Sequence, residues 1–264
     1  MKIGFYQFAP KLKDKDYNLK KVEDNLTREK FDLVVLPELF NIGYAFSSRE
    51  EILPFSEPVP GETTEKLQNL AKSLNTIIIG GFAEREGDKI FNSSCLTTPN
   101  DIKIYRKVHL FKTEKLIFDK SINTGFYPYN VTIPSTKIQA KIGMLICFDW
   151  LFPEAARSLA LRGAQIIAQP ANLVLPYCQS AMKIRALENH VFIITANRIG
   201  EERGLSFTGQ SQIVNPKGEV ILNALRDEEC MKFIEINPLD ADDKKITELN
   251  DIFEDRRKEF YYIG

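Results

Sequence analysis

Short apolar runs alternate with amphipathic segments along this chain, and that alternation constrains its fold more than any other sequence feature. Short apolar runs are typical of strands, and apolar residues three and four apart are typical of helices. In the first half, the pattern predicts strands at residues 2–8, 32–36 and 76–82, with helices at residues 16–30 and 62–74 between them. The first helix is polar, and we expect its solvent side to carry Asn18, Lys21 and Glu23.

The second half repeats this alternation. It predicts strands at residues 141–147, 165–169 and 191–197, and helices at residues 153–162 and 179–190. Turn sequences mark two hairpins and a last strand, at residues 91–98 with 101–106, 207–214 with 219–222, and 231–236. Hairpins mixed with strand–helix–strand units predict an α/β fold of two mixed β-sheets covered by helices. No linker or repeat divides residues 1–264, so we expect one domain.

The charge balance and the cysteine spacing exclude several classes of function. The 35 Lys and Arg residues and 36 Asp and Glu residues give a net charge of -1, unlike the basic surface of nucleic-acid-binding proteins. The four cysteines lie far apart and only two histidines are present, so the close ligand spacing of a zinc site is missing. We expect no metal, no cofactor and a small substrate of little charge. With neither a signal pattern nor a membrane span, the cytoplasm is the expected location.

Residues 251–264 combine charged side chains with aromatic ones. A segment of this composition exposes apolar surface unless it packs against something. Two arrangements satisfy that requirement. The segment either docks on its own core or forms an arm across a dimer interface, and symmetric dimers are the commonest assembly.

Three residues with suitable chemistry come at or just after expected strands: Glu38, Lys107 and Cys147. Ligands of α/β sheets bind beyond the carboxyl ends of strands, so these side chains can converge on one pocket. A lone cysteine after an apolar run is usually a small core residue. Here, however, the chain turns sharply from strand to helix, which lifts the thiol out of the sheet. Nearby charge would then make it a nucleophile.

Glu38 and Lys107 have the chemistry that such a thiol requires. A carboxylate in an apolar pocket takes up a proton near neutral pH, and an ammonium stabilises a developing oxyanion. The common alternatives are a solvated loop glutamate and an exposed lysine. Histidine is the usual base, but His190 ends a helix and is expected to cap or pack there. His109, two residues beyond Lys107, is expected to support the site indirectly.

Together the segments LPELF, YRKVHLF and ICFDWLFPEAAR resemble, in order, the three motifs of the nitrilase superfamily of carbon–nitrogen hydrolases. The resemblance extends over nearly the whole chain. It implies a four-layer αββα sandwich with Glu38, Lys107 and Cys147 as catalytic residues. It also implies a homodimer or a larger homo-oligomer, with the helix after Cys147 and the helix at residues 179–190 at a symmetric interface.

Glu114, in LFKTEKLIF, resembles an additional active-site glutamate of this family, which would position the substrate and assist Glu38 and Lys107. The residues expected around the substrate are Phe118, Phe148, Trp150, Asn172 and Leu173. After Phe118 the chain reads DKSINTGFYP, where a Pro-Gly step is common in the family, so this loop departs from the pattern.

The resemblance implies hydrolysis of a non-peptide carbon–nitrogen bond in a small molecule, through a thioester on Cys147. A carboxamide substrate is favoured, since many members of the superfamily are amidases. A nitrile is the alternative, because both substrates use the same three residues. Two other functions stay open. One is a non-catalytic binding or assembly module, and the other is an acyltransferase in which an amine replaces water at the thioester.

Overall fold

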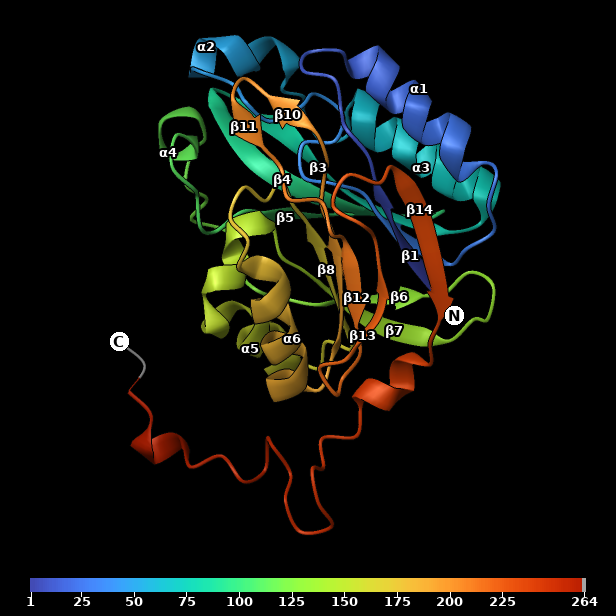
Figure 1. Ribbon diagram of the computed structural model, residues 1–264, viewed down its shortest axis with the longest axis vertical. Coiled ribbons are helices and arrows are strands. Elements are labelled where there is room, and N and C mark those ends of the chain that lie inside the picture. The colour runs from blue at the N-terminus through green and yellow to red at the C-terminus, as the bar shows by residue number, and fades with distance from the viewer. Residues whose placement is uncertain (263–264) are drawn as a thin grey trace.

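A computed structural model describes residues 1–262 and contains two six-stranded mixed β-sheets packed face to face (Figure 1). The first sheet has the order β14 (Cys230–Glu235), β1 (Lys2–Gln7), β2 (Leu33–Val35), β3 (Ile77–Glu86), β4 (Lys89–Thr97) and β5 (Ile102–Arg106). The second has the order β13 (Val220–Asn223), β12 (Gln212–Val214), β9 (Phe192–Ala196), β8 (Ile166–Pro170), β7 (Gln139–Met144) and β6 (Tyr129–Thr132).

Helices cover the outer face of each sheet and complete a four-layer αββα sandwich, which confirms the predicted fold class (Figure 1). The first sheet is covered by α1 (Lys15–Leu26) and α3 (Glu62–Leu74), and the second by α5 (Pro153–Leu161) and α6 (Cys178–Asn189). The short helices α2 (Arg49–Ile52) and α4 (Glu114–Ile117) contact each other, and β10 (Glu201–Glu202) and β11 (Leu205–Ser206) form a small antiparallel hairpin.

Side chains of the central strands of the first sheet point alternately into two separate hydrophobic cores. In β1, Ile3 and Phe5 belong to the core between the two sheets, whereas Tyr6 belongs to the core under α1 and α3. Successive side chains of a strand point to opposite faces, so one apolar run serves both layers. This is why the strands of the sequence read as continuous apolar runs.

Most predicted elements are present, with ends that differ by a few residues. The predicted helix at residues 62–74 has the same limits as α3, while α1 ends at Leu26 rather than at residue 30. The prediction that Asn18 faces solvent is wrong, because this residue is fully buried. Its side-chain amide donates to the carbonyl oxygens of Lys11 at 2.7 Å and Asn41 at 3.0 Å. Hydrogen bonds to the neighbouring loops thus outweigh the polarity of its side chain.

Both sheets have the same succession of strand directions, followed from β14 in the first and from β6 in the second. Each has an antiparallel edge strand, then three parallel strands, then two antiparallel strands. The middle parallel strands, β2 and β8, are therefore equivalent, and the segments beyond them meet. Asn172, after β8, donates from Nδ2 to the carbonyl oxygen of Glu38, after β2, at 2.8 Å.

The C-terminal segment leaves the sandwich after β14 and passes below α5 and α6 in Figure 1. Phe253 packs against the central core, and the guanidinium of Arg157 lies 5.3 Å from the centre of its ring. Further along, Phe260 and Tyr262 are exposed. Residues 263–264 of the predicted arm lie outside the described residues. Within residues 1–262, no helix is long and apolar enough to cross a membrane.

Candidate active site

Three strand ends bring Glu38, Lys107 and Cys147 together in the interior. Glu38 follows β2 and Lys107 follows β5 in the first sheet, whereas Cys147 follows β7 in the second. All three are buried, with at most 4% of each residue exposed. Lys107 Nζ lies 2.7 Å from Glu38 Oε1, with both side chains fully shielded from solvent. The site thus lies at the contact between the two sheets.

The ammonium of Lys107 lies between two carboxylates. Besides Glu38, both carboxylate oxygens of Glu114 lie 2.8 Å from Nζ. Burial alone opposes the charge on Lys107, but attraction to Glu114 and Glu38 outweighs it and raises the pKa of the lysine. Lys107 therefore carries a permanent positive charge in this site.

Glu38 has one occupied and one free oxygen. Oε1 accepts hydrogen bonds from Lys107 and from Asn92 Nδ2, at 2.7 Å each. Oε2 is buried and has no hydrogen-bond partner among residues 1–262. Burial raises the pKa of this carboxyl, the charge of Glu114 adds to the rise, and Lys107 limits it. Oε2 is thus a proton acceptor already stripped of water.

Cys147 lies at a strained turn, in the first residue of a 3₁₀ segment, Cys147–Leu151. Its φ of 41° is in the left-handed region, which side chains with a Cβ rarely adopt. Gln169 Nε2 holds this conformation by donating to the Cys147 carbonyl oxygen at 3.0 Å. Burial, then the charge of Glu38, raises the pKa of the thiol, so it rests as a neutral thiol and needs a base to become a nucleophile.

Close backbone approach explains how Glu38 reaches this position. A Cβ on Gly81, in β3, would lie 2.7 Å from Glu38 Cα, so only glycine fits beneath it. The next residue, Leu39, has a φ of 48°, which turns the chain sharply after Glu38. The amide of Phe40 then donates to the carbonyl oxygen of Gly81 at 3.1 Å and anchors the turn.

Two contacts of the carboxylates were not predicted from the sequence. Asn92, in β4, donates to Glu38, and the hydroxyl of Tyr44 donates to Glu114 Oε1 at 2.7 Å. Both are single polar residues in segments without a motif, so no sequence signal distinguishes them. These two hydrogen bonds give partners to buried carboxylate oxygens that would otherwise depend on Lys107 alone.

A narrow pocket opens beside Cys147. It is lined by Phe111, Cys147, Phe148, Trp150, Asn172, Leu173, Val174 and Leu175. Four of the predicted pocket residues are therefore beside the thiol. Phe118 is not among them, because it packs in a separate core cluster with Leu39 and Ile117. Its amide donates to the Glu114 carbonyl oxygen at 2.8 Å, which closes the turn of α4.

The two histidines lie outside the group formed by Glu38, Lys107 and Cys147. His109 Nδ1 lies 2.8 Å from Asp149 Oδ1, and its ring stacks on Phe152 with 3.5 Å between ring centres. His190 ends α6 in the left-handed conformation, which confirms the predicted capping role. Among the described residues, no group of three or more His, Cys, Asp and Glu side chains is arranged to hold a metal ion.

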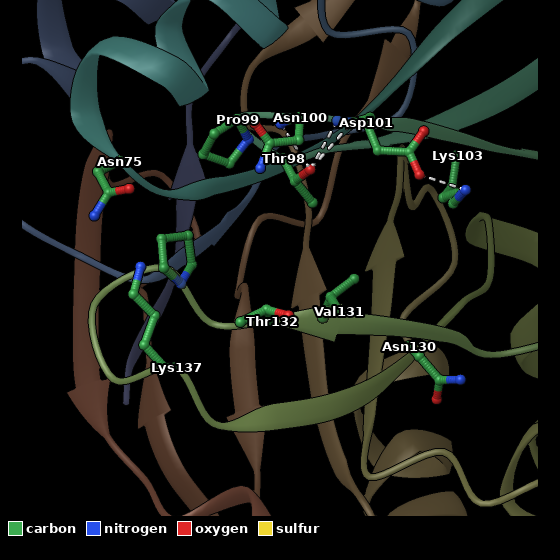
Figure 2. Close-up of a pocket in the computed structure, with 11 residues that line it drawn as sticks. Asn75, Thr98, Pro99, Asn100, Asp101, Lys103, Asn130, Val131, Thr132 and Lys137 are labelled. Carbon is green, nitrogen blue, oxygen red and sulfur yellow. Dashed lines mark hydrogen bonds and ion pairs between the residues drawn. The ribbon is translucent and has the colours of Figure 1, made fainter.

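A second hollow lies between the β4–β5 turn and the β6–β7 hairpin (Figure 2). Thr98, Asp101, Lys103 and Lys137 are among its lining residues, and Lys103 forms an ion pair with Asp101 across one side. None of its lining residues belongs to the group around Cys147. This surface hollow is therefore separate from the buried group.

Comparisons with known proteins identify the family of this chain. A profile of the carbon-nitrogen hydrolase family matches residues 2–242. The chain is 44% identical to a nitrilase of Pyrococcus abyssi over 99% of both chains. It is 32% identical to an (R)-stereoselective amidase of a Pseudomonas species, over 86% of this chain and 82% of that one.

A solved structure supports the fold independently. The carbon-nitrogen hydrolase of Helicobacter pylori superposes with a TM-score of 0.86 at 23% identity, over 99% of this chain and 96% of that one. Family profile, sequence relatives and fold thus agree over nearly the whole chain. The chain belongs to the carbon-nitrogen hydrolase family, within the nitrilase superfamily.

Proposed function

We propose that this protein hydrolyses a small, uncharged carboxamide through a thioester on Cys147, with Glu38 as general base and acid and Lys107 as oxyanion stabiliser. The observation that carries the proposal is the buried contact of Lys107 with Glu38 beside a neutral thiol. A lysine that stays charged suits oxyanion stabilisation, and a carboxyl with a raised pKa suits proton transfer near neutral pH.

The proposed course uses side chains and water alone. Glu38 takes the thiol proton as the sulfur of Cys147 bonds to the carbonyl carbon, and the π electron pair moves onto the oxygen. Lys107 and the backbone N–H of Phe148 stabilise that negative charge. The carbon–nitrogen bond then breaks, Glu38 protonates the leaving nitrogen, and ammonia or an amine departs. Water, deprotonated by Glu38, attacks the thioester, and the thiol and a carboxylic acid are released.

Two unpartnered acceptors favour a carboxamide over a nitrile. Glu38 Oε2 and Asn172 Oδ1 are both buried and accept no hydrogen bond from any described residue. The nitrogen and the oxygen of the Asn172 side-chain amide can be told apart, because Nδ2 donates to a carbonyl oxygen, which can only accept. A primary carboxamide brings two N–H donors, whereas a nitrile brings none. An amide can therefore donate to an acceptor of this kind where a nitrile cannot, and a buried unsatisfied acceptor costs about 1–3 kcal/mol.

The pocket wall favours an uncharged substrate. Apart from Cys147 and Asn172 it consists of aromatic and aliphatic side chains. The ammonium of Lys112, an exposed residue, lies 5.3 Å from the Phe111 ring. The buried group behind the pocket has two carboxylates and one ammonium, so its net charge is negative when both carboxyls are ionised. A substrate carboxylate would be desolvated there without a counter-charge.

Ammonia release from matched substrates tests this proposal. We expect 4-methylpentanamide to be hydrolysed with a kcat/KM at least about 100-fold above that of succinamate, which has a carboxylate in place of the isopropyl group. The nitrile of the same chain, 4-methylpentanenitrile, is expected to react more slowly than the amide. Equal rates for the neutral and the anionic amide would contradict the substrate class. If none of the substrates releases ammonia, the proposed hydrolase activity is wrong, and a non-catalytic binding module is favoured.

Nitrile hydrolysis is the second candidate, because the relative at 44% identity is a nitrilase. Attack of Cys147 on a nitrile carbon gives a thioimidate whose nitrogen carries the negative charge, so the same lysine can stabilise it. The assay above distinguishes the two candidates, since a faster nitrile than amide reverses the assignment.

The pH dependence of kcat/KM follows from the ionisation of Glu38. The base form is needed, so the rate is expected to rise with pH through the pKa of Glu38, which burial places above its ordinary value of 4.5. Lys107 has a raised pKa and stays charged, so no alkaline fall is expected from roughly pH 7 to 9. Initial rates from about pH 4 to 9 measure both the rise and the absence of a fall. A midpoint at or below 4.5, or a bell with its fall near neutrality, would contradict the roles given to the two residues.

We also propose a homodimer or larger homo-oligomer, located in the cytoplasm. Support for the assembly comes from apolar side chains left exposed on the helices of the second layer and on the C-terminal segment, namely Leu161, Ile184, Leu187, Phe260 and Tyr262. Exposed apolar side chains concentrated on one face of a molecule are typical of subunit contacts.

A further inference from the structure

Asp149 lies two positions beyond Cys147, and its carboxylate accepts four hydrogen bonds. It is fully buried, yet it has no ammonium or guanidinium partner among the described residues. Its two oxygens instead receive hydrogen bonds from Tyr105 Oη at 2.7 Å, Ile146 N at 2.9 Å, His109 N at 3.2 Å and His109 Nδ1 at 2.8 Å. A buried carboxylate is tolerated only when its oxygens are satisfied in this way.

The donors come from both sides of the contact between the sheets. Tyr105, in β5, and His109 stand two residues before and two residues after Lys107. Ile146 immediately precedes Cys147 in the chain. One carboxylate therefore holds the segment that carries the ammonium and the turn that carries the thiol. No other hydrogen bond between side chains of these two segments is present among the described residues.

We propose that Asp149 is a positioning residue that sets the placement of Lys107 relative to Cys147. The proposal rests on the function given above for these two residues. Without the hydrogen bonds from Tyr105 and His109, the end of β5 and the turn at Cys147 are joined by apolar packing alone. Displacement of a catalytic group by about 1 Å can lower a rate by about 100-fold.

The test compares two tyrosines that each lose one hydroxyl. Tyr105→Phe removes the hydrogen bond to Asp149, and its ring stays in the core. The matched control is Tyr129→Phe, whose hydroxyl donates to the carbonyl oxygen of Ile104 at 2.7 Å, next to Tyr105 but without contact to Asp149. We expect Tyr105→Phe to lower kcat by about 10- to 100-fold with little change in KM. The control should stay within about threefold of the parent enzyme in both constants.

A second measurement does not depend on turnover. Alkylation of Cys147 by iodoacetamide, followed by mass spectrometry, reports how well Glu38 and Lys107 activate the thiol. We expect the rate to fall in Tyr105→Phe and to stay at the parent value in Tyr129→Phe. In the double variant Tyr105→Phe/Asp149→Asn, the two effects should be less than additive, since both act on one hydrogen bond.

The outcomes separate this inference from the proposed function. Equal kcat and equal alkylation rates in Tyr105→Phe and Tyr129→Phe would overturn the positioning role even if the enzyme hydrolyses amides normally. A change confined to KM would overturn it as well. If the parent protein releases no ammonia, the proposed function fails, and the alkylation rates still decide whether Asp149 places Lys107 relative to Cys147.

Discussion

Cys147→Ala is expected to lower the turnover of every carboxamide substrate by at least about 10⁴-fold, because the atom that forms the thioester is removed. The fold should persist, since alanine fills most of the same space and Gln169 still holds the carbonyl oxygen of residue 147. In the unchanged protein, mass spectrometry of a slowly hydrolysed substrate should find the acyl group on the peptide that contains Cys147. Ammonia release under saturating substrate measures the loss of turnover.

Cys95→Ala is the matched control for this experiment. Cys95 is also fully buried, and burial raises the pKa of its thiol to about 12. It lies in the core between the first sheet and its helices, away from the carboxylates around Lys107. We expect its replacement to leave kcat within a factor of about three. Turnover that survives in Cys147→Ala would show that another group attacks the substrate and that the thioester course is wrong.

Lys107→Met is expected to abolish activity and also to destabilise the protein by roughly 3–5 kcal/mol, because it leaves two buried carboxylates without their ammonium. Methionine has a similar length, so the loss is one of charge and not of packing. Urea denaturation followed by circular dichroism measures the free energy of unfolding. Lys103→Met, on the exposed side of β5, removes an ion pair of solvent-exposed groups and should change stability by less than about 1 kcal/mol.

The stability of Lys107→Met is also expected to depend on pH. Lys107 lowers the pKa of Glu38, so its removal raises that pKa further. The folded variant then binds a proton that the unfolded chain does not, and its stability should fall as pH rises from about 5 to 8. Adding Glu114→Gln should recover part of the stability, since one buried charge is gone, but no activity. A Lys107→Met protein as stable as its parent would contradict the ion-pair account.

Much of the fold could be predicted from the sequence because apolar periodicity is a local property. The helix at residues 62–74 has Leu67, Leu70 and Ala71 on its buried face, and this pattern fixed both of its limits. The edge strand β6 was not predicted, since prolines stand close to both of its ends and only Val131 is buried. The burial of Asn18 was also missed, because its partners lie in loops whose path no local pattern specifies.

Some residues of the candidate site could likewise be predicted from local motifs, and others could not. The convergence of Glu38, Lys107 and Cys147 could be predicted because each stands in a motif at a strand end, and the structure brings the three together. Their catalytic roles stay a prediction. Asn92 and Tyr44, which hold the carboxylates, stand outside any motif and meet them only through sheet packing. Phe118 was expected in the pocket but packs beside Ile117, because its position is set by the short helix before it and not by the substrate.

The pairing of β14 with β1 has a consequence for how the chain can fold. β14 is the last strand in the sequence, yet it completes the first sheet, with Lys2 paired to Glu235. All strands of the second sheet come between β5 and β14 in the chain. During synthesis, one edge of β1 therefore stays open until nearly the whole chain has emerged, and open strand edges invite aggregation. A chain shortened before residue 230 would leave this edge open permanently, because β14 is the strand that pairs with it.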